Sequence, residues 1–147
     1  MGGTEITING GTFDGRIQTT GYIGCGIYHP QDGILTVNGG LFMIPGGVGA
    51  VIRAGQATFN GGTFNVVGTG QGFVGDSKNI VETTGIFVDG AANYPGWPNC
   101  EVTINNVTVG GMNKNAPKVI VTVPEGEDGH DRLIVDTDTF SGNIEYR

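Results

Sequence analysis

The chain has little charge, few aromatic residues and almost no cysteine. Charged residues make up 14% of the 147 residues, aromatic residues 8%, and there are two cysteines. Two cysteines are too few for the disulfide framework of a small secreted domain. Apolar residues alternate around Cys25 and Cys100. This pattern predicts two buried thiols, with a disulfide between them as the alternative.

Long apolar runs and clusters of basic residues are also missing. No segment approaches the roughly 18 apolar residues of a membrane-spanning helix, so no membrane insertion is predicted. The net charge is −7, and a negative surface repels phosphate groups, so no nucleic-acid partner is expected. A basic segment followed by an apolar stretch, as in a signal peptide, is not visible. We interpret this as a removed export signal or as departure from the cell inside a virus particle.

Glycine is the most abundant feature, with 29 residues. A Gly-X-Y repeat is absent, which excludes collagen, and the apolar content of 37% is too high for a disordered linker. Glycine at this level, combined with many Thr, Val, Ile and Asn residues, is typical of short strands joined by tight turns.

An internal repeat organises most of the chain. Each copy reads apolar, Thr, apolar, Asn, then two turn residues and a second short apolar segment. The four copies are residues 6–13, 35–42, 57–64 and 102–109. The first three residues of each copy alternate as a strand does, and in three copies a Gly-Gly pair then allows a sharp turn.

A second motif supplies a third strand to the repeat. We align its copies as Gly26-Ile27-Tyr28, Ala50-Val51-Ile52 and Gly85-Ile86-Phe87. Three short strands separated by turns describe one coil of a β-solenoid. Equivalent residues of successive coils should then stack in inward columns. The predicted columns are Ile8, Val37, Phe59 and Ile104, and Phe13, Phe42, Phe64 and Val109.

These repeats resemble those of right-handed parallel β-helix proteins, which include pectate-lyase-like enzymes, bacterial surface adhesins and phage tailspikes and fibres. The predicted fold is therefore all-β: a short right-handed parallel β-helix (solenoid) of about four coils over residues 1–112. Residues 113–147 hold two strand-like runs, 119–123 and 133–137, on either side of an acidic loop. We expect them to form a C-terminal β-hairpin that acts as a cap or an oligomerisation tail.

The Asn of each repeat has two explanations. Stacked coils would place the inward-facing side chains of Asn9, Asn38, Asn60 and Asn105 close enough to satisfy one another in a ladder of amide hydrogen bonds. Alternatively, Asn tolerates the backbone geometry that precedes a turn.

The candidate ligand site lies in the insertion from Asp89 to Cys100. It contains the only tryptophan, and an exposed aromatic ring on a stiff loop suits the C–H face of a sugar. The predicted ligand-binding residues are Asp89, Asn93, Tyr94 and Trp97, unless the two rings fold back on the solenoid. A weaker candidate group is Tyr28, His29 and Asp32.

No catalytic residue, metal ligand or cofactor is predicted. Nucleophile-elbow and zinc-binding motifs are absent. The carboxylates that a polysaccharide lyase or hydrolase would need are scattered through the loops, as are the cations. These residues are Asp14, Asp32, Asp76, Glu82 and Asp89, with Arg16, Arg53 and Lys78. The acidic loop over residues 125–131 lacks EF-hand spacing, so we interpret it as a solvated hairpin tip.

Taken with the resemblance, these features predict a non-enzymatic virion structural protein, a fibre or spike module that mediates attachment. The expected partners are two further copies in a homotrimer, other virion proteins and a cell-surface glycan. Its expected location is the virion, the extracellular space or the cell surface. One alternative is a carbohydrate-binding or adhesive module of a bacterial surface protein, and another is a polysaccharide lyase or hydrolase.

Overall fold

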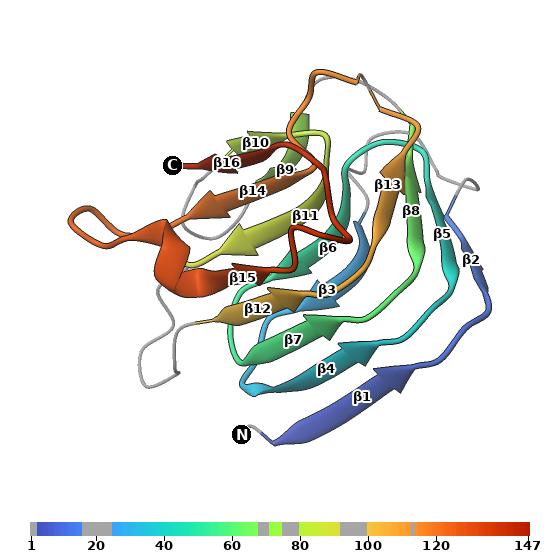
Figure 1. Ribbon diagram of the computed structural model, residues 1–147, viewed down its shortest axis with the longest axis horizontal. Helices are drawn as coiled ribbons and strands as arrows, with labels where there is room; N and C mark the ends of the chain where they lie inside the picture. The colour runs from blue at the N-terminus through green and yellow to red at the C-terminus, as the bar shows by residue number, and fades with distance from the viewer. Residues whose placement is uncertain (1–2, 16–24, 68–70, 75–79, 92–99, 113) are drawn as a thin grey trace.

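The computed structural model describes residues 3–15, 25–67, 71–74, 80–91, 100–112 and 114–147, the side chains of 71–74 and 80 excepted. The described chain is built from β-strands in three parallel sheets and one two-stranded antiparallel sheet (Figure 1), with one short 3-10 helix, η1 (Gly129–Arg132). Within these residues, no helix is long and apolar enough to cross a membrane.

The chain visits the three sheets in a fixed order. The first sheet holds β1 (Thr4–Ile8), β4 (Gly33–Val37), β7 (Gln56–Phe59), β12 (Glu101–Ile104) and β15 (Leu133–Val135). The second sheet holds β2 (Thr12–Asp14), β5 (Leu41–Ile44), β8 (Thr63–Val66) and β13 (Thr108–Gly110). The third sheet holds β3 (Cys25–His29), β6 (Val48–Ile52), β11 (Thr84–Asp89), β14 (Val119–Thr122) and β16 (Ile144–Tyr146).

We call one pass through these sheets a rung. Rung 1 is β1 to β3, rung 2 is β4 to β6, rung 3 is β7 to β11, rung 4 is β12 to β14, and rung 5 is β15 and β16. Neighbouring rungs pair in parallel in each sheet, and rung 5 has no strand in the second sheet. Figure 1 shows the rungs stacked from β1 to β15. This topology is compatible with the predicted β-solenoid.

The C-terminal hairpin prediction is wrong. The run at 119–122 is β14, which pairs in parallel with β11 and β16, and the run at 133–135 is β15, which pairs in parallel with β12. The tail therefore extends the same sheets as the strands before residue 112. Its apolar runs are continuous at β14 because the third sheet is buried on both faces: Val119 and Val121 face the main core, and Ile120 faces a second cluster.

Rung 5 also carries a fifth copy of the repeat that the sequence pattern obscured. Leu133 pairs with Val102 and Val135 with Ile104, so Asp136 follows at the position of Asn105. Its backbone N–H donates to the carbonyl of Ile104 at 2.8 Å, as that of Asn105 does to Phe59. Phe140 then comes four residues later, like Phe13 in rung 1. Aspartate in place of asparagine and Thr-Asp in place of Gly-Gly concealed the match.

The two predicted inward columns are confirmed by the strand register. Ile8, Val37, Phe59 and Ile104 are consecutive partners in the first sheet, and Phe13, Phe42, Phe64 and Val109 are partners in the second. The ring of Phe42 stacks on those of Phe13 and Phe64, with ring centroids 4.6 Å apart in both cases. Burial of these side chains is the main source of stability for the stack.

The Gly-Gly turns need glycine for two different reasons. The second glycine has positive φ, +106° at Gly11, +117° at Gly40 and +106° at Gly62, a region that side chains disfavour. The first glycine does not; a Cβ on Gly61 would instead lie 2.6 Å from the carbonyl oxygen of Asn38 in the rung below. Close packing of successive turns therefore selects the first residue, and backbone conformation selects the second.

The second motif is shifted by one residue in rung 2. Ile27 pairs with Ala50 and Tyr28 with Val51, so Gly49, not Ala50, is the equivalent of Gly26 and Gly85. The reason is again close approach of backbones, since a Cβ on Gly26 would lie 2.7 Å from the carbonyl oxygen of Gly49.

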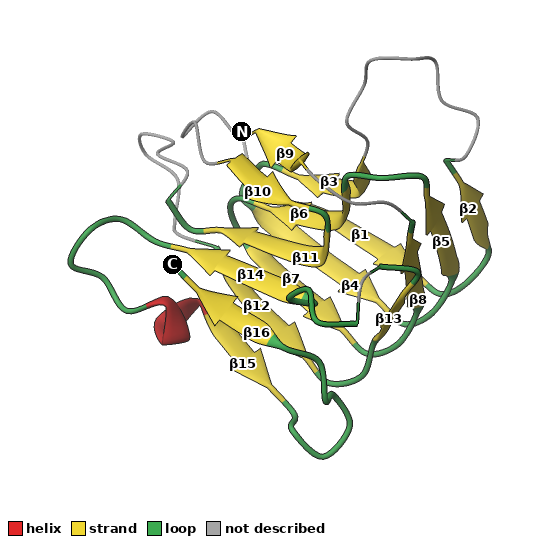
Figure 2. Ribbon diagram, turned by 90° about the horizontal axis from the view of Figure 1, so that it is seen from above, coloured by secondary structure: helices red, strands yellow, loops and turns green. Residues whose placement is uncertain are grey.

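The outer face of the third sheet has its own apolar cluster. It comprises Val48, Val51, Val81, Phe87 and Ile120, with Cys25 packed against it. Val81 belongs to β10 (Ile80–Glu82), which pairs antiparallel with β9 (Gln71–Val74). This two-stranded insertion of rung 3 lies beside the third sheet in Figures 1 and 2, and its Val81 buries the outer cluster.

Candidate functional site

Only one residue of the predicted ligand site is described by the structure. Asn93, Tyr94 and Trp97 lie outside the described residues. Asp89 ends β11 and is fully buried. Its carboxylate accepts a hydrogen bond from Arg53 Nε at 3.0 Å and another from Thr122 Oγ1 at 3.2 Å. Asp89 is thus bound by side chains of its own chain, and the ligand-binding role of the four residues stays a prediction.

The partners of Asp89 join four successive rungs. Arg53 Nη1 also donates to the hydroxyl of Tyr28, at 2.9 Å. Tyr28 belongs to rung 1, Arg53 to rung 2, Asp89 to rung 3 and Thr122 to rung 4, and we call them the Arg53 network. The side chains of Arg53 and Asp89 are 1% and 0% exposed. An ion pair buried to this extent contributes to stability only while both partners are present, because removing one leaves an unpaired charge in the interior.

The Arg53–Asp89 ion pair could have been predicted from the sequence if the second motif had been aligned on Gly49 and not on Ala50. With Gly26, Gly49 and Gly85 in one column, Arg53 and Asp89 fall at the same position of rungs 2 and 3. Opposite charges at equivalent positions of neighbouring rungs are close enough to pair. Sequence reasoning instead treated the two residues as scattered candidates for a catalytic groove.

His29 is a buried polar residue of rung 1. It pairs with Ile52, a core residue, and is 6% exposed. Its Nε2 has no hydrogen-bond partner among the described residues. Burial lowers the pKa of His29 from its ordinary value, against smaller opposite effects of the Gly33 backbone and the nearby Asp32 charge. The imidazole is therefore neutral at pH 7.

The predicted amide ladder is confirmed, but the prediction that it faces inward is wrong, because its side chains are exposed on the outside of the stack. Asn38 Nδ2 donates to Asn9 Oδ1 at 2.8 Å, Asn60 Nδ2 to Asn38 Oδ1 at 2.9 Å, and Asn105 Nδ2 to Asn60 Oδ1 at 2.7 Å. Each Asn after Asn9 thus donates to the Asn of the rung before it. Asp136 occupies the next position and has no amide group to donate, so the ladder ends at Asn105.

The outer face of the first sheet carries a second polar column beside the amide ladder. Thr7, Thr36, Thr58 and Thr103 are consecutive partners in the sheet register. Each lies two residues before an Asn of the ladder. This face therefore presents hydroxyl groups and amides at the spacing of the strands, about 4.8 Å.

The remaining acidic candidates are dispersed. Glu82 binds Arg147, which also binds Glu145 at 2.7 Å. Asp14 and Asp32 lie in different cavities, whereas Asp76, Arg16 and Lys78 are outside the described residues. In the acidic loop, Asp128 caps η1, and Glu127 binds Arg132. Among the residues that the structure describes, no three His, Cys, Asp or Glu side chains could hold a metal ion.

Both cysteines are free thiols. Burial raises the pKa of Cys100 to about 12 and also raises that of Cys25. The predicted buried thiols are confirmed for Cys100, which is fully buried, and in part for Cys25, which is half-buried. Both thiols stay protonated at pH 7, so neither offers a thiolate nucleophile.

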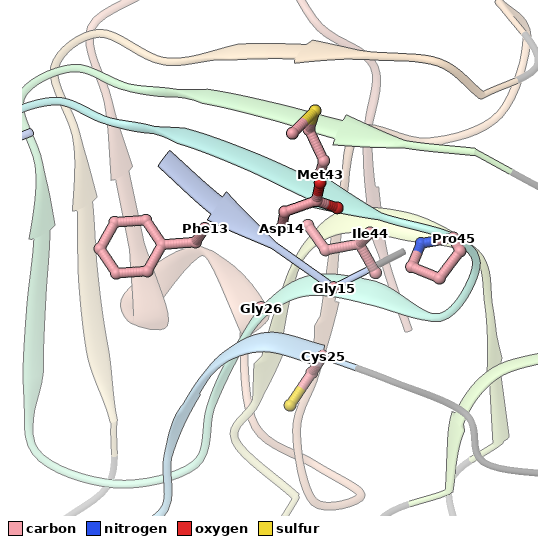
Figure 3. A pocket seen from close by; sticks show the side chains of 8 residues that line it. All are labelled: Phe13, Asp14, Gly15, Cys25, Gly26, Met43, Ile44 and Pro45. Carbon is pink, nitrogen blue, oxygen red and sulfur yellow. The ribbon is translucent and has the colours of Figure 1, made fainter. Parts of the chain in front are cut away.

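Two open cavities flank the first rungs. One, of about 380 Å³, lies between the second and third sheets and is shown in Figure 3. Its lining is mostly apolar, with Phe13, Cys25, Met43 and Pro45, and Asp14 as its charged group. The other, of about 420 Å³, lies beside the starts of β4 and β7 and includes Asp32 and Glu101.

Comparison with known proteins adds no relative. No protein-family model, no curated protein and no solved structure matches the chain. The resemblance of its repeats to those of parallel β-helix proteins therefore stays a prediction.

Proposed function

We propose that this protein is a non-enzymatic structural module of a virion fibre or spike, built as a right-handed parallel β-solenoid that takes part in attachment. Right-handed crossovers between parallel strands are nearly universal. The observation that carries the proposal is that the side-chain contacts run along the stack. The amide ladder, the stacked phenylalanines and the Arg53 network each join successive rungs.

Contacts of this kind make a stiff rod. Rungs 1 to 4 are held together by backbone pairing in all three sheets, and rung 5 is paired in the first and third sheets. Columns of side chains in the core and on the outer face join the same rungs. Two carboxylates that a lyase would need, Asp89 and Glu82, are bound to arginines instead. A mechanical role therefore fits the chemistry of the described residues better than catalysis does.

The proposed assembly is a homotrimer that contacts other virion proteins. The strands of residues 115–147 continue the three sheets, so a trimer contact through this tail would use the sides of rungs 4 and 5. Light scattering of the purified chain gives the mass directly. A mass of three chains supports the trimer, and a single chain at all concentrations contradicts it.

Detection in virus particles tests the proposed function itself. Antibodies against the folded chain should label fibres or spikes of purified particles in immunogold electron microscopy, and mass spectrometry should find the chain in the same particles. Labelling of a bacterial cell surface without particles would contradict the virion role and favour the adhesive alternative.

A carbohydrate-binding module is the second candidate, favoured by the outer face of the first sheet. Its threonine column and amide ladder offer hydroxyl and amide groups that can hydrogen-bond sugar hydroxyls in a regular array. A glycan array probed with the chain should then show binding that Thr58→Val weakens. If Trp97→Ala abolishes binding and Thr58→Val leaves it unchanged, the site lies in the 89–100 insertion instead.

A further inference from the structure

At the N-terminal end of the stack, the inward-facing side chains of rung 1 have no earlier rung to pack against. Ile6 and Phe13 point into the core column of their sheets but are 45% and 43% exposed. One face of the Phe13 ring lies on Phe42, with planes 4° apart. In the sheets of the described chain, the rung 1 strands β1, β2 and β3 are the edge strands. Such an edge is a template for another strand.

The C-terminal end has a different surface. Leu133 and Phe140, the rung 5 equivalents of Ile6 and Phe13, are only 6% exposed. Val135, Ile144 and Tyr146 are partly buried against the core. Leu133 and Phe140 are therefore covered by the chain itself, and the outer surface of this end is formed by the edge strands β15 and β16 with the partly buried Val135, Ile144 and Tyr146.

We propose that copies of this chain stack head to tail, with rung 5 of one copy taking the place of a rung before rung 1 of the next. The inference rests on the proposed structural role, for which an extended stack supplies length. Translation along the axis keeps all strands parallel, so β15 can extend the first sheet at β1 and β16 can extend the third at β3.

The strand register predicts which residues would meet, and their chemistry is complementary. Val135 would continue the column of Ile8, and Ile144 that of Ile27. Both pairs are apolar and half-buried in the single chain. Phe140 would similarly continue the column of Phe13, although it has no strand around it.

The polar columns match as well. Asn38, Asn60 and Asn105 each donate to the Asn of the rung before, whereas Asn9, the first of the four, accepts from Asn38. Asp136 of the neighbouring copy would place a carboxylate in front of the Asn9 amide, and a carboxylate is a strong acceptor. Glu5 would lie in the column of Arg132, the residue before Leu133. Arg132 binds Glu127 in its own chain, and a second carboxylate can share a guanidinium.

The negative charge of the N-terminal end also favours contact with the C-terminal end of another copy (head to tail) over contact between two N-terminal ends (head to head). Glu5 and Asp14 are both exposed at the N-terminal end, and two such ends brought together would set these carboxylates against each other. Like charges directly opposite across a strand pair are destabilising. A head-to-tail contact uses two different surfaces, so it repeats and gives linear assemblies.

The test is sedimentation velocity on the full chain at increasing concentration. We call the smallest assembly that the chain forms, a single chain or the proposed trimer, the unit. As the concentration rises, the wild type should form species whose masses are whole multiples of the unit mass. Ile6→Lys, which blocks the N-terminal end, and Ile144→Lys, which blocks the C-terminal end, should each stop this growth. An equimolar mixture of the two variants should form one complex of twice the unit mass, because each retains one intact end.

Matched variants keep the outcome interpretable. Ile34→Lys and Ile134→Lys place the same charge on the outer face of the first sheet, where the side chains are 42% and 58% exposed, and should not prevent growth. If a lysine at position 6 or 144 prevents folding, judged by circular dichroism, Glu5→Arg and Asp136→Arg block the same ends from exposed positions.

Three outcomes would overturn the proposal. In the first, the wild type stays a single unit at every concentration. In the second, Ile144→Lys alone still pairs, which indicates a head-to-head contact. In the third, the mixture of the two blocked variants does not associate. None of these outcomes changes whether the chain is detected in virus particles. Failure of the head-to-tail proposal is therefore distinct from failure of the proposed function.

Discussion

Rung 3 and rung 1 carry nearly the same repeat sequence, yet equivalent residues are buried in rung 3 and exposed in rung 1. Phe64 and Ala57 are buried between two neighbours, whereas Phe13 and Ile6 have a neighbour on one side. A repeat sequence therefore specifies a conformation, and the position in the stack decides how much free energy each residue contributes. The same substitution at an inner and at an end rung should measure this difference.

The largest contrast is expected in the phenylalanine column. Phe42→Ala removes a ring that is 1% exposed and stacked on both sides, and should lower the free energy of unfolding by about 3–5 kcal/mol. Phe13→Ala removes a ring that is 43% exposed and should cost less than half as much. Urea denaturation of both variants measures the two losses. Equal losses would show that the N-terminal end is covered in solution.

The turns give a smaller contrast with the same design. Gly61→Ala sets a Cβ 2.6 Å from the Asn38 carbonyl oxygen, whereas at Gly10 nothing lies within 4 Å of the Cβ. Gly61→Ala should lower the free energy of unfolding by about 1–3 kcal/mol. Gly10→Ala should leave it unchanged or raise it by about 0.4–1 kcal/mol, because it restricts the unfolded chain. A large loss at Gly10 would mean that another rung packs against it.

The dependence of stability on pH tests the burial of His29 in rung 1. Burial lowers the pKa of His29 below its ordinary value of 6.5, so the unfolded chain binds this proton more tightly than the folded chain does. Stability due to His29 is then complete above about pH 6.5 and is lost as the pH falls below it. His29→Gln should flatten this part of the stability profile, measured by thermal melts. A profile that His29→Gln leaves unchanged would place the imidazole in contact with water.

Much of the architecture was predictable because it depends on local pattern. Period-two strands, the turns and both inward columns follow from residues that repeat with little variation, such as Ile8, Val37 and Phe59. The Arg53 network and the fifth rung were missed for a common reason. Both depend on register between rungs, which a shift of one residue at Ala50 or a change from Asn to Asp at position 136 conceals. The aromatic insertion at Tyr94 and Trp97 stays a prediction.

The smallest expected effect concerns the end of the amide ladder. Asp136 sits at the ladder position, and its Oδ1 accepts from the backbone N–H of Asp138 at 3.0 Å. Asp136→Asn keeps that acceptor and adds an Nδ2 group that can donate to Asn105 Oδ1, so the free energy of unfolding should rise by about 0.5–1.5 kcal/mol. Removing one negative charge from a chain of net charge −7 could by itself stabilise the fold. Asp138→Asn removes the same charge two residues away without extending the ladder, and it should give a smaller gain in urea denaturation. Equal gains from the two variants would assign the effect to charge, and the ladder would then contribute nothing at rung 5.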